Sequence, residues 1–443
     1  MGGLETDLYQ LTMAAGYFQA GKVNEVATFE LFVRRLPPTR NYLIAAGLQQ
    51  AVDYLLNLSF KAEEIAYLRG LRQFSQAPAG FFDFLGRMRF TGDLDAVAEG
   101  TPVFEGEPLL RVRAPLIEAQ IPETYLLATI NFQTAVATKA SRLVEAAGSR
   151  AVVEFGTRRA HSPAAGILAG RAAYIGGSTG TSNVEAGFRY GIPVFGTAAH
   201  SWVQSFTSEL EAFRQLQQLL GENTVYLIDT YDTLEGARRA ASLGRPLWGV
   251  RLDSGNLFEL SRSVRQILDE AGLHEARIMA TGDLNEYKIL ELVAAKVPID
   301  AFGVGAELAT SADAPALGGV YKLVELETEG EKRHTAKLSP EKYTMPGAKQ
   351  VFRYERHDEI ACDWEQPLPG GRPLLAPVIR NGRLVQQLPS AAEAREHSRR
   401  CLAELPKKYL SLFAIDEPYP VRYTAAQHAL LTEIRRRLAG SRL

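Results

Sequence analysis

Arg251 and Asp253 carry opposite charges two positions apart in the segment VRLDSGN. The apolar run Leu247–Leu252 predicts a short buried strand here. Alternate side chains of a strand point to the same side, so we expect the guanidinium and the carboxylate on one face. Together they suit a charged ligand that bears hydroxyl groups, or a metal ion. An internal salt bridge is the alternative, because such pairs are also structural features of many proteins.

His200 is a second candidate for chemistry, because imidazole serves as an acid, a base or a nucleophile near neutral pH. It stands three residues after Thr197, just past the apolar run Ile192–Phe195. A lone histidine is more often structural than catalytic. The functional interpretation of His200 therefore depends on its position just past a predicted strand. Neither Cys362 nor Cys401 lies in a recognisable motif, so covalent thiol chemistry is not expected.

Two glycine-containing segments, TGD at 281–283 and GVGA at 303–306, each precede a predicted helix. Glycine lets backbone amides approach an anion, and the N-terminus of a helix favours phosphate. Taken singly, most glycine-containing segments of this kind are explained by tight turns. Arg158, after Gly156 and Thr157, suits a second anion. The chain has no GxxxxGK[ST] motif, so a nucleotide phosphate is not expected in a P-loop.

Six short apolar runs are expected to position these residues. The predicted strands are Ala151–Glu154, Pro193–Gly196, Val225–Ile228, Leu247–Leu252, Arg277–Ala280 and Ala301–Val304. Helical stretches separate most of them, which is the pattern of a parallel α/β protein. Each run ends in polar or glycine residues, and this indicates a barrel-like arrangement around one site. A single tip such as Asp229 is equally well explained as a helix N-cap.

The two ends of the chain have a different pattern. Leu4–Ala20 predicts a helix with Thr6 as N-cap and an apolar stripe that leaves Tyr9 on another face. Short antiparallel strands are expected within 90–114, and the chain is strand-rich again after Gly318. We therefore expect an N-terminal α+β flanking domain over 1–120 and an α/β barrel over 121–330. Residues 331–443 are expected to pack on the N-terminal domain.

Composition excludes several classes of protein. The 443 residues are 46% hydrophobic and 23% charged, which is ordinary for a globular protein of more than one domain. A formal net charge of −2 gives no bulk attraction to nucleic acid or to an acidic membrane. The start, MGGLETDLYQ, lacks a signal-peptide pattern, and no apolar run is long enough to span a bilayer. With two cysteines only, a cytoplasmic protein is expected.

Ten segments in order resemble the nicotinate phosphoribosyltransferase family. They are TDLYQLTM, INFQTAVATKASR, EFGTRRAHSP, GGSTGTSNVEAG, GTAAHSW, VRLDSG, ATGDL, FGVGAELAT, GGVYKLVEL and PGAKQVFR. The resemblance covers most of the chain. It implies a type II phosphoribosyltransferase: an irregular TIM-like α/β barrel with a flanking α+β domain built from both ends of the chain.

The resemblance also implies a reaction. Nicotinate and phosphoribosyl pyrophosphate (PRPP) give nicotinate mononucleotide and pyrophosphate, the first step of NAD salvage from nicotinate. ATP hydrolysis is coupled to this transfer through phosphorylation of a histidine, which by motif is His200. Mg²⁺ is implied as the partner of PRPP and pyrophosphate, with its protein ligands unassigned. A homodimer with shared active sites is implied, with no nucleic-acid or membrane partner.

The family's site residues transfer to matching positions of this sequence. Nicotinate contacts fall on Tyr9, Thr197 and Arg251, and the catalytic set is His200, Asp253 and Asp283. The PRPP and product phosphates fall on Arg158, Asp253, Gly282, Asp283, Gly305 and Thr310. Chemistry agrees for two of them: Tyr9 offers a π-face to the pyridine ring, and Arg251 can pair with the nicotinate carboxylate.

Three alternatives stay open. Relatives that use nicotinamide carry Asp where this chain has Ser182, and an aspartate would accept a hydrogen bond from the amide but repel a carboxylate. Ser182 therefore favours the acid as substrate. Transfer to quinolinate would want more cations for two carboxylates and has no use for ATP. A ligand-binding homologue without catalysis is the third alternative, and the presence of every tip residue argues against it.

Overall fold

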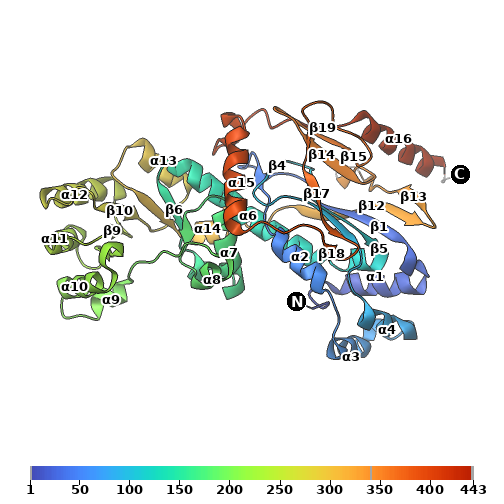
Figure 1. Ribbon diagram of the computed structural model, residues 1–443, viewed down its shortest axis with the longest axis horizontal. Helices are drawn as coiled ribbons and strands as arrows, with labels where there is room; N and C mark the ends of the chain where they lie inside the picture. Colours follow the sequence, from blue (N-terminus) through green and yellow to red (C-terminus); the bar gives the residue numbers. More distant parts are fainter. Residues whose placement is uncertain (1, 340–341, 441–443) are drawn as a thin grey trace. The chain divides into compact units, whose positions relative to one another are not determined.

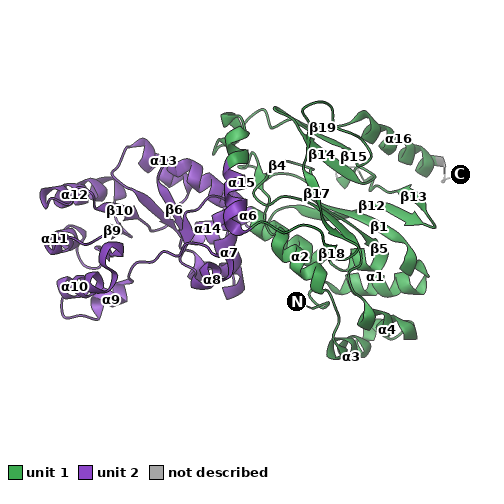
Figure 2. Cartoon of the chain, viewed as in Figure 1, with its two compact units in different colours: residues 1–134, 316–389, 400–443 green, residues 135–315, 390–399 purple. Residues whose placement is uncertain are grey.

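The computed structural model describes residues 2–339 and 342–440, which fold into two compact units (Figure 2). Unit 1 comprises residues 1–134, 316–389 and 400–443, so it is built from both ends of the chain. Unit 2 comprises residues 135–315 and 390–399. Among the described residues, no helix combines the length and the apolar content needed to cross a membrane.

A seven-stranded antiparallel sheet forms the centre of unit 1 (Figure 1). Its strand order is β13 (Glu331–His334), β12 (Gly319–Thr328), β1 (Val26–Val33), β5 (Pro108–Pro115), β3 (Asp93–Val97), β17 (Leu375–Arg380) and β18 (Arg383–Leu384). Both faces of β1 are largely buried, including Thr28 and Glu30 between its apolar residues. Glu30 is fully buried there because Lys349 pairs with it at 2.8 Å.

Two smaller sheets complete the strands of unit 1. One has the order β16 (Arg372–Pro373), β14 (Lys349–Arg353), β15 (Asp358–Cys362) and β19 (Val421–Tyr423). The other pairs β2 (Leu43–Ile44) with β4 (Pro102–Val103). Lys349, the partner of Glu30, is the first residue of β14, so an ion pair links the four-stranded sheet to the central one.

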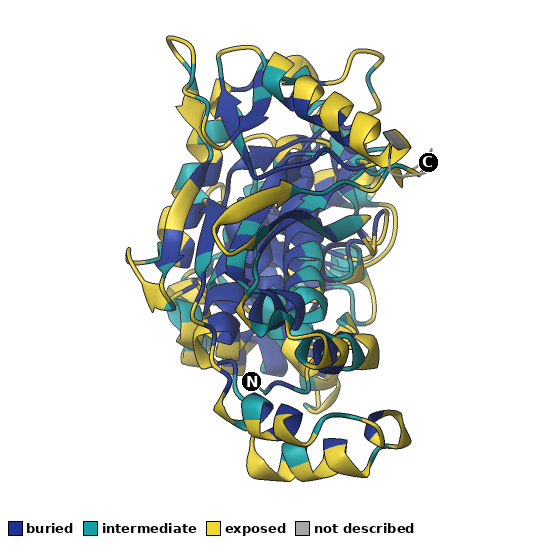
Figure 3. Cartoon of the chain, turned by 90° about the vertical axis from the view of Figure 1, so that its right-hand side faces the viewer, coloured by how far each residue is buried: buried dark blue, intermediate teal, exposed yellow. Residues whose placement is uncertain are grey.

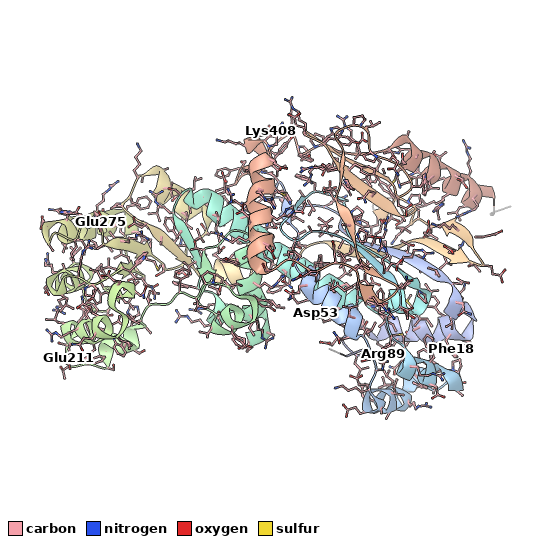
Figure 4. All side chains as sticks on the ribbon, viewed as in Figure 1. Phe18, Asp53, Arg89, Glu211, Glu275 and Lys408 are labelled. Atoms are coloured by element: carbon pink, nitrogen blue, oxygen red, sulfur yellow. The ribbon has the colours of Figure 1, made fainter. Side chains whose placement is uncertain are left out.

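Helices surround these sheets. They are α1 (Leu8–Gln19), α2 (Leu48–Asn57), α3 (Ala62–Gly70), α4 (Ala79–Arg87), α5 (Leu116–Gln120), the start of α6 (Glu123–Ala147), the end of α15 (Ala391–Glu404) and α16 (Ala425–Gly440). Figure 3 shows the strands largely buried, whereas α3 and α16 turn exposed residues outward. Phe18 of α1, labelled in Figure 4, packs edge-on against Phe81 of α4 with ring centroids 5.9 Å apart.

The N-terminal helix is present, but its predicted N-cap is wrong. Helix α1 begins at Leu8, and Asp7 occupies the N-cap position. The Thr6 hydroxyl instead donates to the carbonyl of Ile121 at 2.9 Å, and the Asp7 carboxylate accepts from the hydroxyl of Thr124 at 2.7 Å. Both side chains therefore tie the start of α1 to the α5–α6 corner, a tertiary role that a local capping rule cannot predict.

Unit 2 is built on a six-stranded parallel sheet. Its order is β7 (Gly180–Thr181), β6 (Ala151–Glu154), β11 (Ala301–Val304), β10 (Arg277–Ala280), β9 (Gly249–Leu252) and β8 (Val225–Leu227). Strands β6, β10 and β11 have the predicted bounds. Strands β8 and β9 are shorter than their predicted runs, by one residue at the end of β8 and two at the start of β9.

The predicted strand Pro193–Gly196 is reduced to one parallel bridge between Val194 and Thr181. Its neighbour β7 is only two residues long and offers no further ladder positions. Gly180 is the first residue of β7, although glycine is rare in strands. A Cβ at Gly180 would lie 2.3 Å from the Pro193 carbonyl oxygen, so only glycine allows this close approach.

Unit 2 contains the helices α7 (Pro163–Ile175), α8 (Val184–Tyr190), α9 (His200–Gln204), α10 (Glu209–Leu220), α11 (Thr233–Leu243), α12 (Leu257–Glu270), α13 (Glu286–Ala294) and α14 (Ala306–Ala309). Most of these helices follow a strand and begin at its carboxyl end, whereas α9 follows the bridge at Val194 and α10 follows α9. Side-chain N-caps fix six of the starts: Ser162, Asn183, Ser208, Asp232, Asn256 and Asn285. The loops between strand ends and helix starts therefore have defined positions at one edge of the sheet.

Candidate active site

Arg251 connects several of the residues at this edge. On β9 it points its guanidinium at three partners. Its Nη2 donates to Oδ1 of Asp253 at 2.6 Å, and Nε donates to the hydroxyl of Thr281 at 2.8 Å. Its Nη1 donates to the hydroxyl of Thr197, also at 2.8 Å. The predicted common face of Arg251 and Asp253 is thus present, and so is the internal salt bridge offered as the alternative. A guanidinium carries five N–H groups, so two remain that these residues do not engage.

Asp253 is an ionised acceptor at the end of β9. Burial alone raises the pKa of its carboxyl group, but the hydrogen bond from Thr281 and the charge of Arg251 outweigh burial. The net effect lowers the pKa of Asp253 below its ordinary value. The carboxylate is therefore charged at neutral pH and can accept hydrogen bonds from ligand hydroxyl groups.

His200 is the first residue of α9, and its side chain is 43% exposed. Its Nδ1 lies 3.1 Å from the hydroxyl of Thr230, and its Nε2 lies 3.8 Å from Oδ2 of Asp253. The threonine contact orients the ring. The imidazole is therefore both oriented and accessible from solvent.

Asp229 ties the end of β8 to the end of β9. Its Oδ2 accepts from the hydroxyl of Ser254 at 2.6 Å and from the backbone amide of Asp253 at 3.2 Å. The N-cap interpretation of Asp229 is wrong, because Asp232 caps α11. The other oxygen of Asp229, Oδ1, is buried and has no hydrogen-bond partner among the described residues.

Metal-binding capacity at this edge is limited. Within residues 2–339 and 342–440, no group of three or more His, Cys, Asp or Glu side chains is arranged to hold a metal ion. Mg²⁺ is usually held by one or two carboxylates together with substrate phosphates. The unpartnered Oδ1 of Asp229 and the ionised Asp253 fit that kind of shared site. A closed metal cage built by the protein alone does not fit.

The loop after β10 requires glycine. Gly282 has a φ of +91°, and a Cβ there would lie 2.1 Å from the carbonyl oxygen of Asp253. Asp283 follows with a φ of +44°, and Asn285 then caps α13 by accepting from the amide of Lys288. The backbone between β10 and α13 can therefore approach an anion closely, and the helix start favours negative charge.

A second tight approach joins the loops after β6 and β11. A Cβ at Gly156 would lie 2.6 Å from the carbonyl oxygen of Gly305, which is the N-cap residue of α14. Glu154 is fully buried and accepts from the amide of Gly156 and from the hydroxyl of Thr181. Burial raises the pKa of Glu154. These contacts hold the turn that carries Arg158, whose side chain is exposed.

The comparisons identify the family. A nicotinate phosphoribosyltransferase of Mycobacterium tuberculosis is 44% identical over 95% of this chain and 91% of its own. The human nicotinate phosphoribosyltransferase is 31% identical over 92% of each chain. The chain belongs to the nicotinate phosphoribosyltransferase family. Family models match in three stretches: the N-terminal domain of nicotinate phosphoribosyltransferase (4–131), the C-terminal domain of quinolinate phosphoribosyl transferase (136–314) and the C-terminal domain of nicotinate phosphoribosyltransferase (371–431).

Solved structures agree with this family assignment. The crystal structure of human nicotinic acid phosphoribosyltransferase covers 97% of this chain with a TM-score of 0.85 at 28% identity. That of nicotinate-nucleotide pyrophosphorylase from Pyrococcus furiosus covers 91% with a TM-score of 0.76 at 27% identity. The expected fold, an irregular TIM-like α/β barrel with a flanking α+β part from both chain ends, is confirmed.

The structure brings many of the predicted phosphoribosyltransferase site residues of unit 2 together. Thr197, His200, Arg251 and Asp253 form one connected group, with Gly282 and Asp283 in the next loop. Ser182 donates its amide to the carbonyl of Glu154, beside the turn of Arg158. The Thr310 hydroxyl donates to the carbonyl of Ala306, which follows Gly305. Tyr9 lies in unit 1, on α1, with 49% of its surface exposed.

Sequence reasoning missed Thr230 and the hydrogen bonds of Thr281, although Thr281 lies in the segment TGD that was singled out. The hydroxyl of Thr281 accepts from Arg251 and donates to Asp253, and that of Thr230 contacts His200. Both threonines stand at or just past the end of a strand, beside residues that were singled out. That position was the available signal, but threonine is so common in strands that it did not distinguish them.

Proposed function

We propose that this chain transfers the phosphoribosyl group of PRPP to nicotinate, giving nicotinate mononucleotide and pyrophosphate. The observation that carries the proposal is the guanidinium of Arg251, held beside an ionised Asp253 at the carboxyl ends of the strands. Such an arrangement can recognise a carboxylate and ribose hydroxyl groups in one place. The names of the relatives that align along most of the chain support the same substrate.

In this reaction one bond forms and one breaks. The pyridine nitrogen of nicotinate donates its electron pair to the anomeric carbon, and the bond from that carbon to the pyrophosphate oxygen breaks with its electrons. Positive charge develops on the ribose ring, so catalysis depends on positioning and on charge stabilisation. In our proposal the carboxylate of Asp253 faces that charge and orients the ribose hydroxyls, and Asp283 takes a supporting place in the next loop.

Nicotinate would bind through its carboxylate. Arg251 has two guanidinium N–H groups that do not bond to Asp253, Thr197 or Thr281. These two groups suit a planar carboxylate, so nicotinate can bind while the ion pair with Asp253 persists. Thr197 would line the same position, and Ser182 would accept the acid without charge repulsion. Tyr9 would stack on the pyridine ring.

The phosphates would bind at the glycine-containing loops. Backbone amides near Gly282, Asp283 and Gly305 can approach an anion, and Arg158 and Thr310 would add a cation and a hydroxyl. Mg²⁺, shared between the phosphates and the carboxylates of Asp229 and Asp253, would neutralise charge on the departing pyrophosphate.

ATP would act through His200. The imidazole would accept the γ-phosphoryl group at a ring nitrogen while ADP leaves, and water would later remove the phosphate. Its exposure and its threonine contact are compatible with that role. Phosphorylation would add negative charge to the start of α9, beside Asp253, and so change the order of that segment.

We also propose a homodimer with shared sites in the cytoplasm. The position of Tyr9 supports the shared sites, because Tyr9 lies off the buried face of α1 formed by Leu11, Ala14 and Ala15. A partner subunit could then be the surface that Tyr9 meets. Cys362 is a buried free thiol, which suits a reducing compartment.

An assay of the purified protein with nicotinate, PRPP and Mg²⁺, with and without ATP, tests the proposed reaction. We expect nicotinate mononucleotide and pyrophosphate in equal amounts, and faster formation with ATP. Nicotinamide and quinolinate serve as matched substrates that differ in charge. Turnover of nicotinamide or quinolinate in preference to nicotinate would contradict the proposal, and so would the absence of any nucleotide product.

A further inference from the structure

We propose that Lys139 is a positioning residue that holds the two phosphate-binding loops, after β10 and after β11, in a common arrangement. Lys139 lies on α6 and has 1% of its side chain exposed. It belongs to the segment INFQTAVATKASR, to which no role has been given. The inference rests on the proposed function only in naming PRPP as the ligand of these loops.

Three carboxylates surround the Lys139 ammonium. Its Nζ lies 2.6 Å from Oε2 of Glu286, 3.1 Å from Oδ1 of Asp313 and 3.2 Å from Oε2 of Glu307. Burial alone lowers the pKa of Lys139, but the carboxylates of Glu286 and Asp313 outweigh burial and raise it. The side chain is therefore a permanent cation at neutral pH, and its charge is fully compensated.

Two of these carboxylates, Glu286 and Glu307, stand at the helix starts that follow the loops. Glu286 is the first residue of α13, three positions after Asp283, and it is fully buried. Glu307 is the second residue of α14, two positions after Gly305. One ammonium thus joins the segment that leads from Gly282 and the segment that leads from Gly305, although the two belong to different strand–helix repeats.

Local structure alone would hold these segments weakly. Helix α14 is only four residues long, and a helix of that length has little stability of its own. Asp283 has a φ of +44°, a backbone conformation that aspartate adopts at a cost. Tertiary contacts must therefore hold both loops in place. Arg142 supports α13 separately, since its Nε lies 3.0 Å from Oε1 of Glu286. Lys139 adds the contact to α14.

The expected consequence is a selective loss of phosphate binding. In Lys139→Met a side chain of similar length is kept but the charge is removed, so Glu286 retains its ion pair with Arg142 and Glu307 loses its ion pair with Lys139. The loops would then open more often, and the amides would no longer be aligned for PRPP. Thr197 and Arg251 do not contact Lys139, so nicotinate recognition should be spared. This separates a positioning role from a general loss of folded protein.

Hydrogen exchange of the unliganded protein tests the link between the loops. We expect peptides covering 281–287 and 303–308 to exchange about tenfold faster or more in Lys139→Met than in the wild type. Arg239→Met is the matched control, because it removes the cation from another buried carboxylate of unit 2, Glu209, at 2.9 Å. In the control variant, the exchange rates of both peptides should equal those of the wild type. Unchanged exchange in Lys139→Met would overturn the inference.

Steady-state kinetics tests the consequence for PRPP. Lys139→Met should raise the KM for PRPP about tenfold or more and leave the KM for nicotinate within about twofold. Equal increases for the two substrates, or faster exchange without any change in the KM for PRPP, would overturn the positioning role. Absence of PRPP turnover in the wild type would refute the proposed reaction, while hydrogen exchange still decides whether Lys139 couples the loops.

Two milder variants keep the inference testable if Lys139→Met fails to fold. Lys139→Arg keeps the charge and should restore the KM for PRPP to within about threefold of the wild type. Glu307→Gln removes one contact at a side chain that is 33% exposed. It should speed exchange at 303–308 more than at 281–287. Equal exchange at the two loops in Glu307→Gln would count against a cation that links them.

Discussion

Arg251 and Asp253 form an ion pair, Nη2 to Oδ1 at 2.6 Å, and both also contact the hydroxyl of Thr281. The pair is rigid because one small polar group is shared between its two members. A substrate carboxylate therefore meets a guanidinium that is already oriented, and ribose hydroxyls meet a carboxylate that is already charged. This preorganisation reduces the entropy lost when the substrates bind.

Arg251→Ala should lose about 2–5 kcal/mol of transition-state stabilisation for nicotinate, because the substrate carboxylate and Asp253 would both lose their cation. The measurement is kcat/KM for nicotinate. Arg277→Ala is the matched control, since Arg277 is the first residue of the neighbouring strand β10. It lies at the amino end of that strand, whereas the site lies at the carboxyl ends. The control should retain wild-type kcat/KM. A fall of less than tenfold in Arg251→Ala would contradict the pairing.

Gly282→Ala should damage the loop after β10. The new Cβ would lie 2.1 Å from the carbonyl oxygen of Asp253, and the positive φ would add about 1–3 kcal/mol of backbone strain. We expect a lower thermal midpoint and a raised KM for PRPP. Gly272→Ala is the control, because Gly272 has a φ of +73° with nothing within 4 Å of a Cβ. It reports the strain alone. Equal effects of the two variants would refute the close approach.

His200→Ala should abolish incorporation of label from γ-labelled ATP and uncouple ATP hydrolysis from transfer. Some ATP-independent transfer should survive, because Arg251, Asp253 and the glycine loops remain. His274→Ala is the control: its imidazole also lies beside an aspartate, Asp269 at 3.2 Å, but in the exposed turn that follows α12. Labelling that persists in His200→Ala and disappears in His274→Ala would reassign the phosphorylated residue.

A mixing experiment tests whether active sites are shared between subunits. Tyr9→Ala and His200→Ala homodimers should each be defective. Refolding equal amounts together gives about half mixed dimers in a two-fold assembly. If Tyr9 completes the partner's site, each mixed dimer holds one intact site, so roughly a quarter of all sites recover. A mixture no more active than the average of its parents would refute sharing.

Three barrel strands were predictable from short, mostly apolar runs with polar or glycine residues at their ends. Strand β6 ends in Glu154, whereas β10 and β11 are followed by Thr281 and Gly305, and the bounds of all three follow from that pattern. The run Pro193–Gly196 has the same composition but lacks a neighbour of matching length. Whether an apolar run becomes a strand thus depends on its partner, here β7, and not on its own residues.

The site was predictable as a set of strand tips but not as a network. Polar residues past each strand indicate an edge where ligands bind, and Arg251 and Asp253 follow from alternation. The support by Lys139 and Arg142 was not predictable, since Arg142 and Glu286 are 144 positions apart. The sequence shows only that charged residues occur within an apolar helical segment. It does not indicate which residues pair with them.

The structure of the protein with nicotinate mononucleotide bound tests the central claim most directly. We expect the nicotinate carboxylate within hydrogen-bonding distance of Arg251, the ribose hydroxyls on Asp253, and the phosphate at the backbone amides of the loops that contain Gly282 and Gly305. A product bound elsewhere on the molecule, or one whose carboxylate does not contact Arg251, would contradict the account.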